Sequence, residues 1–178
     1  MCIRDRQRDT SAWVFKISVH GINSIVRYLK LKDIPLNDVN WIYLYRRNIV
    51  EQSISYQKAC RTNQWELLAD QVVADESDVN ISIDAINAEV CRLASISAAW
   101  QTFLEHNGLN PFCIAYEEFR NASDWLPCVT QIFEFFDITY PLPLSVSTEH
   151  QRQSTPFNKQ LHHDYLGFHL DQIPFNLT

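Results

Sequence analysis

Three short apolar and aromatic runs in the chain predict strands, because each has the length of a strand and is bounded by turn-forming or charged residues. They are residues 13–18, 41–45 and 112–116. Helical periodicity separates them, since apolar residues recur every three or four positions over 22–29, in the region after Asn48, and from 82 to 106. A strand, a helix and a second strand in that order predict a βαβ unit, and therefore a parallel sheet.

Local signals mark the ends of two predicted helices. Asn48 precedes a helix over 49–60, and Glu51 follows three residues later, which is the pattern of a capping box. Asn107 and Gly108 follow the stripe at 82–106, and glycine accepts the left-handed conformation that ends many helices. The sequence therefore predicts a capped helix directly after the second strand.

The last third of the chain predicts one more helix and then an irregular tail. Ser123 or Asp124 can cap a helix whose buried face ends near Phe136. Pro141 and Pro143 exclude its continuation, and the residues beyond them are polar with scattered aromatics.

Composition and charge narrow the class of protein. At 178 residues with 46% hydrophobic and 20% charged residues, the chain fits one folded domain. A formal charge of -6 argues against a nucleic-acid partner. The five cysteines form no metal-binding or disulfide pattern and indicate buried or incidental thiols in a reducing compartment.

Neither membrane anchoring nor a metal centre is expected. No apolar run approaches the ~20 residues that span a bilayer, and the charged N-terminus does not resemble a signal peptide, so the expected location is the cytoplasm. His162, His163 and Asp164 are adjacent, and neighbouring histidines rarely bind one ion without other ligands. A solvated or helix-terminal pair is favoured there.

The turn between the strand at 41–45 and the following helix has the features of an anion site. A helix N-terminus presents N–H groups and a positive dipole end, and Arg46 or Arg47 adds a charge-assisted partner. Ser53 and Ser55 add hydroxyl donors in the first two turns. An ordinary turn with solvated arginines is the alternative.

Three segments of this region carry a resemblance to a known family. They are Arg46-Arg47-Asn48, Gln52-Ser53-Ile54-Ser55 and Thr62-Asn63-Gln64-Trp65. In this order they resemble the 3′-phosphate motif of sulfotransferases that use 3′-phosphoadenosine 5′-phosphosulfate (PAPS). The closest similarity is to the bacterial trehalose 2-sulfotransferase type, where Arg-Arg-Asp leads into Gln-Ala-x-Ser and later Thr-x-x-Trp. The resemblance implies that Arg47 and Ser55, ahead of Arg46 and Ser53, bind the 3′-phosphate.

Two further residues are implied by the same resemblance. Tyr116, followed by Glu117 and Glu118, is similar to the family's Tyr-Glu-Asp segment, whose tyrosine can contact adenine. A structural tyrosine at a strand end is an equal alternative. Arg152 with Gln153 resembles a pair that follows the last helix in similar proteins, where the basic residue can close over the nucleotide.

The fold implied by the resemblance is a three-layer α/β fold with a parallel central sheet, flanking helices and P-loop-NTPase-like topology. With three glycines, the chain has no Gly-rich phosphate loop, so the first strand and the phosphosulfate loop are expected to be missing. We therefore expect a non-native leader over 1–12, the C-terminal portion of a sulfotransferase core over 13–140 and an irregular tail over 141–178. Such a fragment is expected to be inactive alone.

The catalytic base is not identified by the sequence. His20 follows the first predicted strand, as a catalytic histidine does in many eukaryotic sulfotransferases, but two more residues separate it from Lys16 here. A histidine at such a junction is more often a hydrogen-bonded turn residue, although its intrinsic pKa suits a general base.

The expected activity is transfer of a sulfuryl group from PAPS, without a metal, to a hydroxyl of a carbohydrate or small-molecule acceptor. Residues 61–80 are expected to form a partly helical excursion, which in the family shapes the acceptor pocket; a plain acidic connection is equally compatible.

The alternative function is a non-catalytic nucleotide-binding or interaction module, or a pseudo-enzyme. A P-loop kinase relative is disfavoured because its loop is absent too. The oligomeric state stays open.

Overall fold

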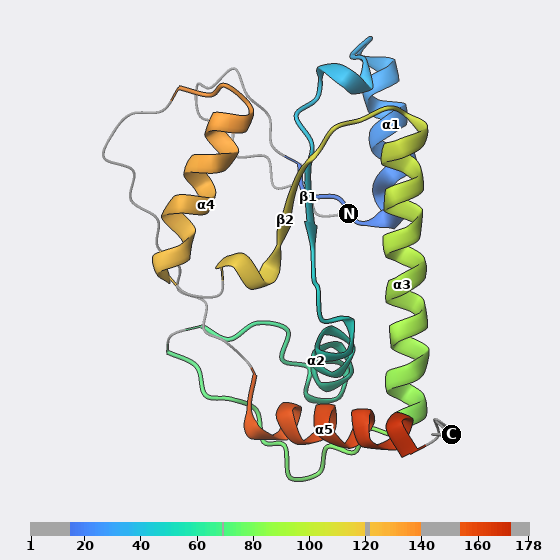
Figure 1. The fold of residues 1–178 in the computed structure, drawn as a ribbon, viewed down its shortest axis with the longest axis vertical. Coiled ribbons are helices and arrows are strands. Elements are labelled where there is room, and N and C mark those ends of the chain that lie inside the picture. The colour runs from blue at the N-terminus through green and yellow to red at the C-terminus, as the bar shows by residue number, and fades with distance from the viewer. Residues whose placement is uncertain (1–14, 69, 120–121, 140–153, 172–178) are drawn as a thin grey trace, which may run out of the picture. The chain divides into compact units, whose positions relative to one another are not determined.

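The computed structural model describes residues 15–68, 70–119, 122–139 and 154–171 of the chain. Five α-helices and two strands are found in these ranges, together with three short 3-10 helices (Figure 1). The helices are α1 (Ile22–Leu31), α2 (Ile49–Thr62), α3 (Ile83–His106), α4 (Ala122–Phe135) and α5 (Pro156–Asp171). The strands are β1 (Ile42–Tyr45) and β2 (Phe112–Ala115), and the 3-10 helices are η1 (Val19–Gly21), η2 (Leu36–Asp38) and η3 (Tyr116–Phe119).

The two strands pair with each other in a small parallel sheet, which confirms a mixed α/β fold in coarse form. Two of the three predicted strands are therefore confirmed. One face of β1 is open to solvent although its residues are apolar, because Ile42 and Leu44 are 50% and 53% exposed. A short two-stranded sheet leaves apolar side chains at the surface when no second layer covers that face.

The predicted strand at 13–18 is not found in its described part. Residues 15–18 have no regular secondary structure. Their burial still alternates, with Phe15 and Ile17 half-buried and Lys16 and Ser18 exposed, which is a pattern typical of strands. Period-two burial alone does not make a strand, because a strand also needs a neighbour for its backbone hydrogen bonds.

The described residues fall into two compact units. One contains the residues up to Tyr43 together with Ile96–Phe112, and the other contains Leu44–Ser95 and the residues from Cys113 onward. The first unit holds α1 and an aromatic cluster. In that cluster the Trp41 indole N–H donates to the Leu36 carbonyl at 2.9 Å, and Phe103 packs edge-on against both Trp41 and Trp100.

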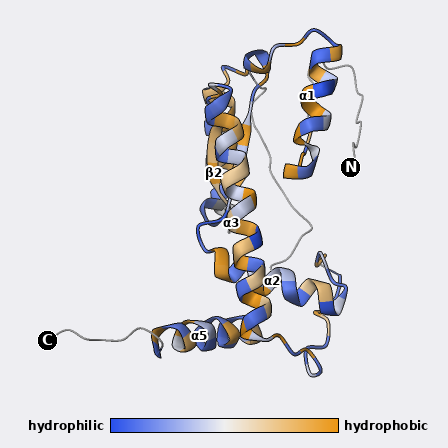
Figure 2. Ribbon diagram, turned by 90° about the vertical axis from the view of Figure 1, so that its right-hand side faces the viewer, coloured by the Kyte–Doolittle hydropathy of each residue, from blue (hydrophilic) through white to orange (hydrophobic). Residues whose placement is uncertain are grey.

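The second unit has the larger hydrophobic core. Ile54 of α2 and Ile86 of α3 are fully buried, and Ile81 and Tyr165 complete the cluster. Helix α5 packs against α2 (Figure 1). Colouring by hydropathy shows apolar residues distributed along the whole length of α3 (Figure 2), as the predicted stripe requires. Sequence reasoning therefore identified α3 correctly, including its left-handed Gly108 at the end, where φ is 61°.

The prediction of an irregular C-terminal tail is wrong over residues 156–171, which form α5. Two features explain this helix. Pro156 is its first residue, where the missing N–H costs nothing, and the Thr155 N–H donates to the Asn158 side chain at 3.2 Å. Phe157, Leu161 and Tyr165 then recur every four residues and pack into the core.

Two smaller expectations are also corrected. Helix α4 begins at Ala122, so Ser123 and Asp124 lie inside it rather than at its cap. Helix α2 continues to Thr62, and the described residues of 63–80 contain no helix, because Asn63 adopts the left-handed conformation that ends α2.

The described cysteines are free thiols, and most of them fit the incidental rather than the buried alternative. Cys60, Cys91 and Cys113 are exposed, whereas Cys128 is half-buried. Burial raises the pKa of the Cys128 thiol.

A buried ammonium group connects three segments of the second unit. Lys58 of α2 is 3% exposed, and its Nζ lies 2.5 Å from a Glu76 carboxylate oxygen and 3.0 Å from Asn158 Oδ1. Thr155 donates its hydroxyl to the same carboxylate at 2.9 Å. A buried charge requires such partners, so this network holds the 63–82 segment and the start of α5 to α2.

Replacement of this lysine tests the network. We expect Lys58→Met to lower the free energy of unfolding by about 3 kcal/mol, because the Glu76 carboxylate would lose its counter-charge in a largely buried position. Urea unfolding followed by circular dichroism measures the change. Lys159→Met is the matched control, since Lys159 is exposed on α5. Equal stability of the two variants would contradict the proposed importance of the buried pair.

Candidate functional site

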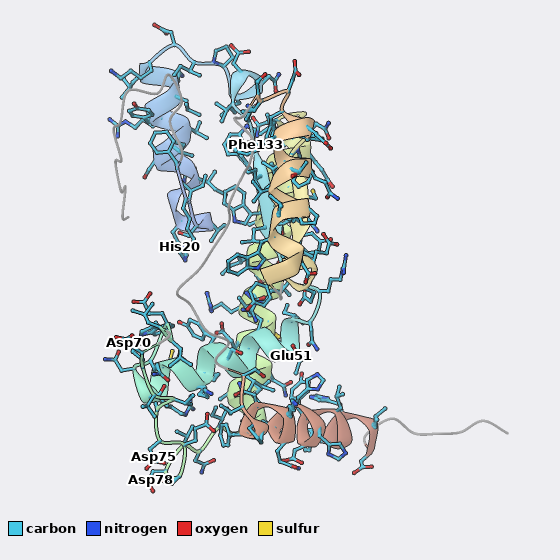
Figure 3. All side chains as sticks on the ribbon, turned by 90° about the vertical axis from the view of Figure 1, so that its left-hand side faces the viewer. His20, Glu51, Asp70, Asp75, Asp78 and Phe133 are labelled. Atoms are coloured by element: carbon cyan, nitrogen blue, oxygen red, sulfur yellow. The ribbon has the colours of Figure 1, made fainter. Side chains whose placement is uncertain are left out.

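The turn from β1 into α2 is fixed by its asparagine cap. The Glu51 N–H donates to Asn48 Oδ1 at 3.0 Å, and the Gln52 N–H donates to the Asn48 carbonyl at 3.1 Å. Figure 3 labels Glu51 in the first turn of α2. The asparagine half of the predicted capping box is thus confirmed. The cap places Arg46 and Arg47 immediately before the positive end of the helix.

A second segment, residues 116–118, reaches the same turn. It follows β2, and parallel neighbouring strands end at the same edge of a sheet. The Arg47 backbone N–H donates to a Glu117 carboxylate oxygen at 3.1 Å, and the Arg47 guanidinium forms an ion pair with Glu118. The Arg46 guanidinium carbon lies 3.9 Å from the centre of the Tyr116 ring. Three predicted site residues, Arg46, Arg47 and Tyr116, are therefore close together.

The Arg47–Glu118 pair is open to solvent. Its side chains are 57% and 45% exposed. Ion pairs of this kind contribute between about 0 and 1 kcal/mol, because water and salt screen them. The Arg47 guanidinium is thus available to exchange Glu118 for a more strongly charged ligand.

Helix α5 adds a histidine to the turn. The Nε2 atom of His162 lies 3.4 Å from the side-chain nitrogen of Asn48, so the imidazole is placed to accept a weak hydrogen bond from the cap residue. His162 is half-buried. This contact joins the asparagine cap of α2 to α5.

The two predicted serines occupy different environments. Ser53 is fully buried, and its hydroxyl donates to the Ile49 carbonyl at 2.8 Å. Ser55 is half-buried on α2. Because Ser53 already uses its proton within the helix, Ser55 is the better hydroxyl donor of the two.

One remaining candidate falls outside the described residues, and the other belongs to the first unit. Arg152 is outside the described residues. His20 is exposed in η1, which belongs to the first unit. Across the described ranges, no group of three or more His, Cys, Asp or Glu side chains could hold a metal ion. No helix in those ranges is both long and apolar enough to span a bilayer.

Sequence reasoning did not identify the acidic and imidazole neighbours of Arg47 and Asn48. Glu117 and Glu118 follow β2 as Arg46 and Arg47 follow β1, so pairing the two predicted strands in parallel would have brought the four together. No sequence signal indicates His162, because its position depends on the packing of α5 against α2.

Removal of the cap tests how the turn is held. We expect Asn48→Ala to reduce the free energy of unfolding by about 1 kcal/mol, because the Glu51 N–H loses its acceptor. Chemical denaturation provides the measurement. Asn37→Ala, an exposed asparagine in η2, is the control, and a cap variant no less stable than that control would show that the hydrogen bond contributes nothing.

Comparison with known proteins identifies the family. The model of the Stf0 sulphotransferase family matches residues 27–159, which is more than half of the chain and includes the turn, α2 and η3. No curated protein and no solved structure matches. The family match confirms the resemblance drawn from the Arg46, Ser53 and Thr62 segments. The chain belongs to the Stf0 sulphotransferase family, the trehalose 2-sulfotransferase type.

Proposed function

We propose that this chain binds the 3′-phosphoadenosine half of PAPS in a sulfotransferase that acts on a hydroxyl of a carbohydrate or small metabolite. Membership of a sulfotransferase family implies PAPS as the sulfuryl donor. The observation that carries the proposal is the position of Arg47, an exposed guanidinium at the capped N-terminus of α2. Helix N-termini and arginine are the groups that proteins most often combine for phosphate binding.

The residues at the turn can bind a phosphate if an existing ion pair is broken. The Arg47 guanidinium forms an ion pair with Glu118, so a phosphate must replace this carboxylate as the partner of Arg47. The exchange is favourable for a phosphate dianion, which carries more charge than a carboxylate and three oxygens for bidentate contact. In the proposal Ser55 donates a hydrogen bond to the phosphate, whereas the Ser53 hydroxyl already donates to the Ile49 carbonyl.

Tyr116 and Arg46 are proposed to contact adenine. A guanidinium stacked on a phenol ring is held by attraction to the ring's negative face, which limits the motion of both side chains. An adenine ring adjacent to this pair gains stacking area from a surface that is already ordered. Arg152 stays a proposal for closing over the nucleotide.

The proposed role ends at donor binding. In sulfuryl transfer the acceptor oxygen bonds to sulfur, the bond between sulfur and the phosphate oxygen breaks, and the acceptor proton passes to a base. Groups that stabilise the departing phosphate are essential to such a step. The chain contains three glycines and no Gly-rich loop to supply them, so we propose that these 178 residues do not catalyse transfer alone. His20 is the candidate base, and a three-layer α/β fold with a parallel central sheet and flanking helices is the proposed fold class.

The same absence favours a second candidate function, a non-catalytic nucleotide-binding or interaction module. The two candidates are separated by incubating the chain with PAPS and a mixture of carbohydrate acceptors and measuring sulfated product. Product formation by these 178 residues would exclude the second candidate and the proposed inactivity together.

Nucleotide binding is tested by thermal stabilisation. We expect 3′-phosphoadenosine 5′-phosphate to raise the melting temperature, and Arg47→Ala to weaken its binding by one to two decades, because a charge-assisted contact contributes about 1.5–3 kcal/mol. Adenosine 5′-phosphate, which lacks the 3′ group, should stabilise much less. Arg27→Ala is the control, because Arg27 is an exposed arginine on α1. Equal stabilisation by both nucleotides would contradict a 3′-phosphate site.

The competing carboxylate offers a test with the opposite sign. We expect Glu118→Gln to strengthen binding of 3′-phosphoadenosine 5′-phosphate several-fold, since the nucleotide no longer displaces a charged partner of Arg47. Isothermal titration at low salt measures the affinity. The control is Glu105→Gln, which removes the same charge from an exposed position on α3. A gain of the same size in the control would mean that net charge alone, and not the ion pair, sets the affinity.

A further inference from the structure

His162 of α5 is a titratable side chain at the start of α2 to which the proposed function gives no role. Its Nε2 atom lies 3.4 Å from the side-chain nitrogen of Asn48, and the imidazole is half-buried. Helix α5 packs against α2, and both helices belong to the second unit. Asn48 caps the helix end at which the phosphate is proposed to bind, so His162 contacts the residue on which that site is built.

The partners of Asn48 determine which form of the imidazole fits. Asn48 Oδ1 accepts from the Glu51 N–H at 3.0 Å, so the amide nitrogen is the atom that faces His162. An amide nitrogen only donates, and the imidazole Nε2 must therefore offer a lone pair. This hydrogen-bond pattern assigns a neutral ring with its proton on Nδ1. A doubly protonated ring would turn an N–H toward an N–H, and the contact would be lost.

An anion at the start of α2 reverses this preference. A negative charge close to an imidazole favours the protonated form, and an imidazolium donates a charge-assisted hydrogen bond to an anionic oxygen. The contact with Asn48 that is given up is weak, because 3.4 Å is long for a hydrogen bond between nitrogen atoms. Histidine changes charge between about pH 5 and pH 8, so the exchange needs no extreme of pH.

We propose that His162 is a proton-linked ligand of the anion that binds at Arg47. In the free chain the imidazole is neutral and accepts from Asn48. On binding of the anion it takes up one proton from the solvent and donates a hydrogen bond to an anionic oxygen. The coupling is reciprocal, so a lower pH strengthens anion binding. The place of the anion rests on the proposed function, whereas the dependence on pH is new, because arginine stays charged throughout this range.

Other charged groups near His162 have to be distinguished from it. Around the start of α2 they are Arg46, Arg47, Glu51, Glu117 and Glu118, and in the first turn of α3, which also packs against α5, Asp84. On α5 itself, Lys159, His163 and Asp164 lie within one turn of His162. Glu118 pairs with Arg47, and Asp164 lies 3.7 Å from His163. Glu51 shares the first turn of α2 with the cap, so it is the carboxylate that a test must separate from His162.

Two anions serve as probes of the full chain. Sulfate keeps the same charge from weakly acidic to weakly basic pH, so a pH dependence of its binding comes from the protein. The phosphates of 3′-phosphoadenosine 5′-phosphate titrate near pH ~6, so with this probe the unaltered chain is compared with each variant at the same pH. Dissociation constants are measured at constant ionic strength, by NMR titration for sulfate and by isothermal titration for the nucleotide.

His162→Gln is the informative variant, because glutamine can still accept from Asn48 but cannot take up a proton. At about pH 6 the unaltered chain should bind both probes about tenfold more tightly than His162→Gln, since a charge-assisted hydrogen bond is lost. The imidazolium form disappears as the pH rises, so the ratio should fall below about twofold at pH ~8.

Two control variants address the neighbours. His163→Gln is the matched control, because His163 is the adjacent histidine and its side chain is 85% exposed. Glu51→Gln removes the carboxylate in the first turn of α2. Both variants should keep the pH dependence of the unaltered chain. Its loss in either one would mean that another group takes up the proton, and would overturn the inference.

A second measurement applies if His162→Gln does not fold. The imidazole C–H signals of the six histidines are followed by NMR in sulfate and in chloride. One histidine that is still present in His163→Gln should titrate at a higher pH in sulfate, and Arg47→Ala should abolish the difference. Identical titrations in the two salts would overturn the inference.

The outcomes separate this inference from the proposed function. Nucleotide binding with the same pH dependence in the unaltered chain and in His162→Gln would overturn the role of His162 and leave the site at Arg47 intact. Sulfate binding whose pH dependence requires His162, without nucleotide binding, would support the role of His162 and contradict the proposed function. Binding of neither anion would overturn both.

Discussion

The second unit depends on the neutralisation of one buried ammonium group. Lys58 lies in the second half of α2 and is 3% exposed. An unpaired ammonium group at such a buried position would strongly destabilise the fold. Glu76 supplies the opposite charge, and Asn158 and Thr155 supply further oxygens. Since these partners come from two segments far from α2 in sequence, the requirement for charge balance also sets where those segments lie.

The site at the start of α2 illustrates a different use of charge. Here Arg47 is exposed, and its acidic partners Glu117 and Glu118 follow a neighbouring parallel strand. An exposed pair is weak, which makes it a poor contribution to stability and a suitable place for exchange with a ligand. Helix α2 thus has a permanent ion pair in its interior and an exchangeable one at its N-terminus. The family match covers both, and it is the exchangeable pair that supports the proposed nucleotide site.

Local patterns predicted the elements whose causes are local. The capped start of α2 follows from Asn48 and its neighbours, and the end of α3 follows from Gly108. Helix α5 was missed although Phe157, Leu161 and Tyr165 recur every four residues, because polar residues surround them and the two prolines at 141 and 143 favoured an irregular tail. The buried state of Lys58 had no sequence signal at all, since a lysine in an amphipathic helix is normally solvated. For the site, sequence identified the arginines and Tyr116, but their partners required the parallel pairing of β1 and β2.

The loop that carries Trp65 supplies its own backbone partners. The Gln64 side chain donates to the Val72 carbonyl and accepts from the Ala74 N–H. In a sheet, a neighbouring strand would provide these backbone hydrogen bonds. A loop closed in this way does not rely on a neighbouring element for its shape between those points. Exposed residues between Trp65 and Val72 can therefore be exchanged with little effect on α2. In evolutionary terms, such a loop can change its exposed side chains while the helix before it stays the same.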